Sequence, residues 1–243
     1  HLLVPVILVL AGYRAQSLWR SLLVVLLASA WAGISRINWL AVPGFIAATL
    51  YFLERPRGDE PLSRYWGRPL LWIGAGSLAG LLTYSGYIFL SGNEAEQFGS
   101  SLSSDLLVYR LLQNRTFPLG ILGAVGLASL PILLMVWRWI ALGSRSLSTD
   151  RWIPVDAMLA VLLVGGVIVS LKIGGGSNLH NLDAYLILLL VLGAYVYFGR
   201  ATSSDPVQTR LRWGEHALLI AVPLFFVLST GSRAPARDRE FGT

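Results

Sequence analysis

The sequence predicts an all-α, polytopic transmembrane helical bundle, and its composition carries that prediction. Of the 243 residues, 55% are hydrophobic and only 13% are charged, whereas soluble domains are about one quarter charged. Several apolar runs approach or exceed the roughly 18 to 20 residues that a helix needs to cross about 30 Å of hydrocarbon. Helices are expected because they satisfy their own backbone hydrogen bonds in lipid. This composition argues against a soluble domain.

Apolar runs divide the chain into about seven predicted spans after an N-terminal remnant. The opening run, residues 2–12, is too short to span, and it lacks the basic start and the cleavage site of a signal peptide. We therefore expect the chain to begin inside a helix of a longer protein. The spans that follow are 17–35, 38–53, 69–91, 118–142, 155–173, 182–198 and 215–230. We expect residues 1–230 to form a single transmembrane domain, followed by a polar, disordered tail over 231–243.

The second and third segments, 17–35 and 38–53, have two interpretations. The segment 38–53 is short and contains Pro43 and Gly44. The two segments either both cross the membrane or form a re-entrant pair, which is tolerated only where it is buried in protein. Both interpretations leave the sidedness of the later loops unchanged.

The arginines predict the orientation of the chain. The net charge of +6 comes from single basic residues between apolar runs, which is typical of topogenic charge rather than of a nucleic-acid surface. Loops on one side hold twelve of these residues: Arg14, Arg20, Arg55, Arg57, Arg64, Arg68, Arg138, Arg145, Arg151, Arg200, Arg210 and Arg212. The opposite loops hold four, namely Arg36, Arg110, Arg115 and Lys172. The first set is assigned to the cytoplasm, so loops 35–39, 92–117 and 174–182 are expected outside the bacterial cytoplasmic membrane.

The long outer loop is predicted to contain a short amphipathic helix. The stretch "SSDLLVYRLLQN", residues 103–114, begins with serines that can cap a helix and has apolar residues at 106, 107, 111 and 112. This spacing is typical of a helix with one apolar face. We expect it to lie along the outer membrane surface.

The first candidate site is "LKIGGGSNLHNLDAYL", residues 171–186. Its three glycines let the backbone turn, and the new helix start beyond them, together with Lys172, favours an anion. Asn178 can cap that helix, while His180 and Asp183 are three residues apart and share a helix face. One histidine and one aspartate do not complete a metal shell, so no metal and no cofactor are expected. The alternative is an ordinary hairpin in which Lys172 reaches back to the interface.

Two further segments are candidates. In "SRINW", residues 35–39, Arg36 and Asn38 lie between two apolar spans, and a guanidinium there suits a phosphate through two parallel hydrogen bonds. The alternative is an interfacial arginine beside Trp39 in an aromatic belt. The loop 93–105 carries three acidic residues that could act as a base or bind a divalent cation, although a solvated loop explains them equally well.

The order of these segments resembles a known family. "SRINWLAVPG", then a long outer loop, then "LKIGGGSNLHNLDAYL" is similar to the C-terminal part of bacterial polytopic glycosyltransferases of the GT-C superfamily, such as protein mannosyltransferases and the aminoarabinose transferases of lipid A. Lys172, Gly174, Asn178 and Asp183 match a late outer loop of the form Lys, any residue, Gly, small residues, Asn, apolar residues and an acid. The spacing from Asn178 to the acid is longer in this chain.

The resemblance implies transfer of a sugar from a polyprenyl-phosphate donor to an acceptor on the extracytoplasmic face. Arg36 and Lys172 would then neutralise the lipid phosphate, and Asn38, Asn178, His180 and Asp183 would line the substrate site. The catalytic acidic residue would precede residue 1. The expected partners are a polyprenyl-phosphate-linked sugar and membrane lipid, with no nucleic acid. Two alternatives remain: an envelope-polysaccharide polymerase or ligase, and a multispanning transporter, which charges at mid-depth would favour.

Overall fold

Every regular element in the described part of the chain is helical, which confirms the predicted class. The computed structural model describes residues 1–92, 105–115, 117–141, 148–172, 178–201 and 211–231. The elements, with η for a 3-10 helix, are α1 (Leu3–Gly12), α2 (Leu18–Ser35), η1 (Ile37–Trp39), α3 (Val42–Glu54), α4 (Leu62–Ser91), η2 (Val108–Leu111), α6 (Gly120–Ala141), α7 (Thr149–Lys172), η3 (Asn178–Asn181), α8 (Asp183–Tyr197) and α9 (Trp213–Gly231).

Five helical segments of the described part are long and apolar enough to cross a membrane. They are 18–35, 37–54, 62–91, 120–141 and 149–172. The chain is therefore compatible with an integral membrane protein. The helices at 183–197 and 213–229 are apolar but shorter, so the count of seven spans stays a prediction.

The two longest helices begin earlier than the apolar runs indicated. The predicted spans began at residues 69 and 155, whereas α4 begins at Leu62 and α7 at Thr149. A proline inside a helix frees the carbonyl four residues before it, which for Pro154 is the carbonyl of Asp150. The indole nitrogen of Trp66 donates a hydrogen bond to that oxygen at 3.1 Å. Helix α7 can therefore continue through its proline without an unsatisfied carbonyl at this position.

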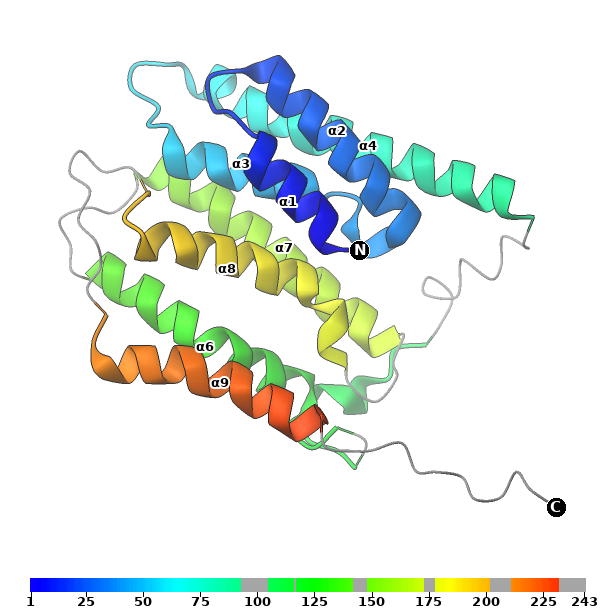
Figure 1. Ribbon diagram of the computed structural model, residues 1–243, viewed down its shortest axis with the longest axis vertical. Helices are drawn as coiled ribbons and strands as arrows, with labels where there is room; N and C mark the ends of the chain where they lie inside the picture. The colour runs from blue at the N-terminus through cyan, green and yellow to red at the C-terminus, as the bar shows by residue number, and fades with distance from the viewer. Residues whose placement is uncertain (93–104, 116, 142–147, 173–177, 202–210, 232–243) are drawn as a thin grey trace.

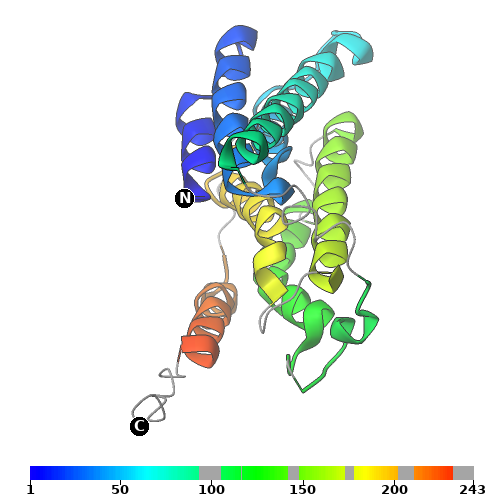
Figure 2. The ribbon, with the colours of Figure 1, turned by 90° about the vertical axis from the view of Figure 1, so that its right-hand side faces the viewer.

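The helices run side by side between two ends of the bundle (Figure 1). One end carries η1, η2 and η3, and we call it the η end. There η2 contacts α6 and α7, while η3 contacts α6, α7 and α8. The described parts of the three loops predicted to be extracytoplasmic therefore gather at one end, and their placement outside the membrane stays a prediction. Figure 2 shows α9 set apart at the edge of the bundle, and its main contact is with α6.

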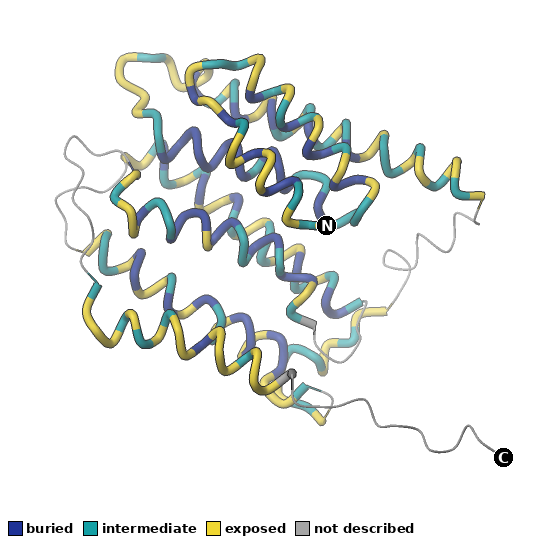
Figure 3. The backbone as a smooth tube through the Cα atoms, viewed as in Figure 1, coloured by how far each residue is buried: buried dark blue, intermediate teal, exposed yellow. Residues whose placement is uncertain are grey.

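Helix α3 is the most buried of the five candidate spans. Two thirds of the segment 37–54 is buried, against 11% of the α4 segment. Helix α3 contacts α1, α2, α4, α7 and α8, and Figure 3 shows it as an almost continuous buried trace. Figure 1 shows α2 and α3 each running between the two ends, as the crossing interpretation of residues 17–35 and 38–53 requires.

Arginine and tyrosine side chains hold the C-terminal end of α3. Arg151, which is only 4% exposed, donates from Nε to the carbonyl of Phe52 at 2.5 Å and from Nη2 to that of Leu53 at 2.7 Å. Tyr195 of α8 donates to Oε1 of Glu54 at 2.6 Å. A cation at a helix C-terminus satisfies the last carbonyls and the helix dipole. Arg151 was counted as a loop charge in the sequence, and the structure instead buries it in the first turn of α7.

The predicted amphipathic helix over 103–114 is wrong for the residues that the structure describes. Residues 105–115 contain only the single turn η2. The amide of Leu107 donates to the carbonyl of Leu171 at 3.0 Å, and Nη1 of Arg110 lies 3.5 Å from the carbonyl of Ser170. The segment therefore satisfies carbonyls at the C-terminus of α7 instead of forming a longer helix. Residues 93–104, 173–177 and 232–243, which include most of the predicted tail, lie outside the described residues.

Cysteine labelling tests the predicted sidedness of the two ends. The chain contains no cysteine, so Gln113→Cys at the η end and Ser63→Cys at the opposite end each introduce one thiol at an exposed position. A membrane-impermeant maleimide added to intact cells should label Gln113→Cys, and it should label Ser63→Cys only after the membrane is permeabilised. The reverse pattern would invert the orientation on which the charge count rests.

Candidate functional site

Asp183 lies at the centre of the contacts at the η end. It is the first residue of α8, where a carboxylate favours the helix dipole. Its Oδ1 accepts hydrogen bonds from the indole of Trp39 at 3.0 Å and from the amide of Ala184 at 2.8 Å. Its Oδ2 accepts from Nη1 of Arg36 at 2.6 Å. Both oxygens are engaged, so this carboxylate holds its neighbours in place and is poorly suited to act as a base.

The end of α2 explains why Arg36 and Trp39 reach the same carboxylate. Helix α2 ends at Ser35, and Arg36 is extended, with φ −167° and ψ 121°. The single turn η1 then follows, closed by a hydrogen bond from the amide of Trp39 to the carbonyl of Arg36 at 3.0 Å. This corner directs the guanidinium and the indole toward the start of α8, 144 residues or more along the chain.

Among the described residues, a single nitrogen of the Arg36 guanidinium makes all of the hydrogen bonds of that group. Nη1 donates to Oδ2 of Asp183 and to the carbonyl of His180 at 3.0 Å. Nε and Nη2 make no hydrogen bond in that part of the chain. The side chains of Arg36 and Asp183 are 27% and 25% exposed, so the pair is neither sealed in the core nor fully solvated. Arg36 is thus fixed on one side and has a planar donor edge left for an anion.

The other predicted site residues are placed less closely together. His180 contributes its carbonyl to Arg36, while its side chain is exposed. Lys172 ends α7, which contacts η3. Asn38 lies in η1 and is partly buried. The backbone of Asn178 begins η3, and its side chain lies outside the described residues.

Trp39 and Asn181 belong to the η end and were not among the predicted site residues. Trp39 is fully buried and shares Asp183 with Arg36, whereas the sequence indicated only an interfacial aromatic. Asn181 is 5% exposed, and a Cβ at Gly166 would lie 2.9 Å from its carbonyl oxygen. The small residue in α7 therefore lets η3 pack close to the helix. The pairing of Trp39 with Asp183 is long-range, and no local spacing could have indicated it.

Metal chemistry has no support among the residues that the structure describes. These residues contain no group of three or more His, Cys, Asp or Glu side chains that could hold a metal ion. Glu94 and Glu96, which the sequence offered as cation ligands with Asp105, lie outside the described part. At the η end the Asp183 carboxylate is already occupied, and the remaining guanidinium nitrogens of Arg36 suit an anion.

Comparisons with known proteins do not place the chain in a family. No protein-family model, no curated protein and no solved structure matches it. The assignment of a function therefore rests on the residues of the η end.

Removing the Asp183 carboxylate should destabilise the protein. Asp183→Ala takes the partner from a guanidinium and an indole, and we expect the free energy of unfolding to fall by about 1–3 kcal/mol, toward the low end because the pair is partly exposed. Thermal unfolding in detergent measures the loss. Asp105→Ala, which changes an exposed acid at the same end, is the control. Equal melting temperatures for the two variants would contradict the anchoring role.

Proposed function

We propose that the η end binds the phosphate of a polyprenyl-phosphate-linked sugar, and that the protein transfers the sugar to an acceptor on the extracytoplasmic face. The observation that carries the proposal is the state of Arg36. Its Nη1 is held by Asp183 and by the carbonyl of His180, while Nε and Nη2 remain to donate. A guanidinium edge of this kind matches two phosphate oxygens.

The position of Arg36 supports a lipid-linked anion. It lies in the connection between two candidate spans, 18–35 and 37–54. A lipid phosphate lies at the boundary of the hydrocarbon, which is where a helix end of a membrane bundle lies. The anchor on Asp183 reduces the conformational freedom that the arginine would lose on binding.

The chemistry of transfer gives Arg36 a defined role. The bond between the anomeric carbon and the phosphate oxygen breaks, and the acceptor oxygen bonds to that carbon and loses its proton to a base. The phosphate leaves with the negative charge, which Arg36 would stabilise as it grows. Lys172, at the end of α7, would add a second positive charge. The described residues of the η end supply no base for this step, because both oxygens of the Asp183 carboxylate are already hydrogen-bonded.

The position of the charges at the η end favours sugar transfer over the transporter alternative. A transport site would place the charges of Lys172 and Asp183 at the middle of the membrane, within broken helices. Lys172 is the last residue of α7, and Asp183 is the first residue of α8. Both residues lie at the η end of the bundle, not midway between its two ends. A polymerase or ligase would share the phosphate site and would differ in preferring a lipid diphosphate.

Lipid binding to the purified protein tests the proposal. A polyprenyl phosphate should bind more tightly than the matching polyprenol, and Arg36→Ala should weaken phosphate binding by about 10- to 100-fold, the loss of one charge-assisted bidentate contact. Arg36→Lys should fall between, because an ammonium cannot donate two parallel hydrogen bonds. Native mass spectrometry with titrated lipid measures the affinities.

The control is Arg64→Ala, which removes an arginine with 74% side-chain exposure at the opposite end and should leave binding unchanged. Equal affinity for the phosphate and the alcohol, or no effect of Arg36→Ala, would refute the phosphate site. A polyprenyl diphosphate that binds much more tightly than the monophosphate would instead favour the polymerase or ligase.

A further inference from the structure

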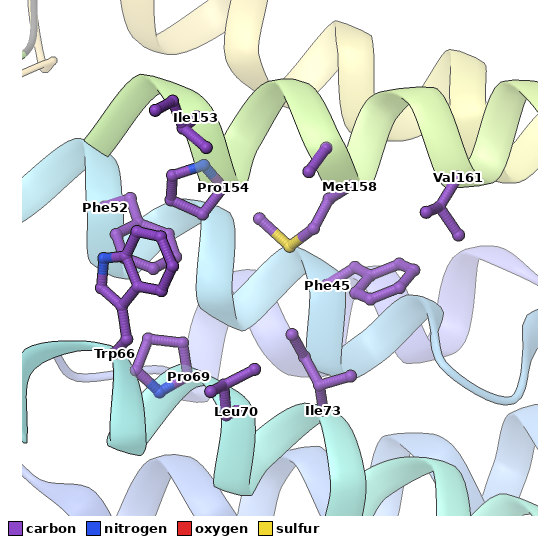
Figure 4. Close-up of a pocket in the computed structure, with 11 residues that line it drawn as sticks. Phe45, Phe52, Trp66, Pro69, Leu70, Ile73, Ile153, Pro154, Met158 and Val161 are labelled. Atoms are coloured by element: carbon purple, nitrogen blue, oxygen red, sulfur yellow. The ribbon is translucent and has the colours of Figure 1, made fainter. Parts of the chain in front are cut away.

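A lateral groove lies between α4 and α7, with α3 as its floor. Its volume is about 310 Å³, and Figure 4 shows side chains of the three helices around it. The side chains that line it are apolar. The one polar side-chain atom among them is the indole nitrogen of Trp66, which donates to the carbonyl of Asp150. Residues that define it are Phe45 and Phe52 of α3, Trp66 and Ile73 of α4, and Pro154 and Val161 of α7.

The length and the lining of the groove suit a hydrocarbon chain. From Ile153 to Val161, two residues of its lining, the wall along α7 is about 12 Å long at 1.5 Å per residue. A single hydrocarbon chain can lie along a wall of this length, and the apolar lining suits such a chain.

Polar groups lie near one end of the groove, where α4 and α7 begin. There Nε of Arg57 lies 3.4 Å from Oδ2 of Asp150, with side-chain exposures of 40% and 20%. The other nitrogens of Arg57 make no hydrogen bond among the described residues. The neighbouring acid Glu60 is occupied by Arg55 and Arg64. An apolar groove that ends beside an exposed guanidinium has the charge pattern of a lipid with an anionic headgroup.

We propose that this groove binds one acyl chain of a membrane phospholipid, with the lipid phosphate at Arg57. The lipid belongs to the leaflet on the side of the bundle opposite the η end, which the charge count predicts to be cytoplasmic. The proposal does not depend on the sugar-transfer function, because it involves other residues at the other end of the bundle. The chain in the groove would fill the space between α4 and α7, whose walls carry Pro69 and Pro154.

Lipid retention by the full chain in detergent tests the proposal. The probe is phosphatidylglycerol titrated into delipidated protein, and native mass spectrometry measures the fraction that retains one lipid. Ala157 lines the groove and is exposed, so Ala157→Phe fills the space and should weaken retention about tenfold. Leu23→Phe, at a 58% exposed position on α2, is the matched control and should bind as the wild type does.

Headgroup and chain are tested separately. Arg57→Gln should weaken phosphatidylglycerol retention severalfold while leaving diacylglycerol, which has no phosphate, unchanged; Arg64→Gln should change neither. A phospholipid with brominated acyl chains should quench the fluorescence of Trp66. The quenching should therefore be smaller in Trp66→Phe than in the wild type. Equal retention in Ala157→Phe and Leu23→Phe, or unchanged retention in Arg57→Gln, overturns the proposal. A stable dimer that Ala157→Phe dissociates would also overturn it, because a second copy would then occupy the groove.

Discussion

The rest of the bundle is arranged around α3, a 13-residue helix in which every residue from 42 to 53 except Phe45 is buried. At about 20 Å it is too short to span the hydrocarbon alone, and η1 extends it at one end. Its neighbours are fixed to it at both ends. At the η end Trp39 bonds to Asp183 at the start of α8, and at the other end Glu54 bonds to Tyr195 of the same helix. Helices α3 and α8 are therefore held together along their lengths.

This arrangement determines which polar groups remain for function. At the opposite end the buried Arg151 donates to the carbonyls of Phe52 and Leu53 at the end of α3, so its charge serves the fold. At the η end the equivalent anchor is an acid, Asp183, and it uses only one nitrogen of Arg36. The contacts at one end therefore engage Arg151 with backbone carbonyls, whereas those at the η end leave Nε and Nη2 of Arg36 to donate. This donor edge is the most specific chemical feature of the η end.

The sequence predicted the helical segments well, because long apolar runs favour helices that can cross a membrane. It predicted the starts of α4 and α7 less well. The first turns of both helices are polar and are followed by Pro69 and Pro154, so the apolar pattern begins only after the helix has begun. Arg36, His180 and Asp183 were each indicated by polarity in an apolar chain. The hydrogen bond from Arg36 to His180 joins residues 144 apart in the chain, and so does the one from Trp39 to Asp183. Local spacing cannot show such a contact, nor could it show that the backbone of His180, not its ring, would bind Arg36.

The central claim is that the remaining edge of the Arg36 guanidinium contacts a lipid phosphate. Solid-state NMR on bilayers with polyprenyl phosphate, using protein labelled with ¹⁵N at the arginine side chains, measures the dipolar coupling between guanidinium nitrogen and phosphorus. The difference spectrum between wild type and Arg36→Lys isolates this residue. We expect a coupling that corresponds to about 4 Å, the separation in a hydrogen-bonded guanidinium and phosphate. A difference spectrum without phosphorus coupling would contradict the proposed site.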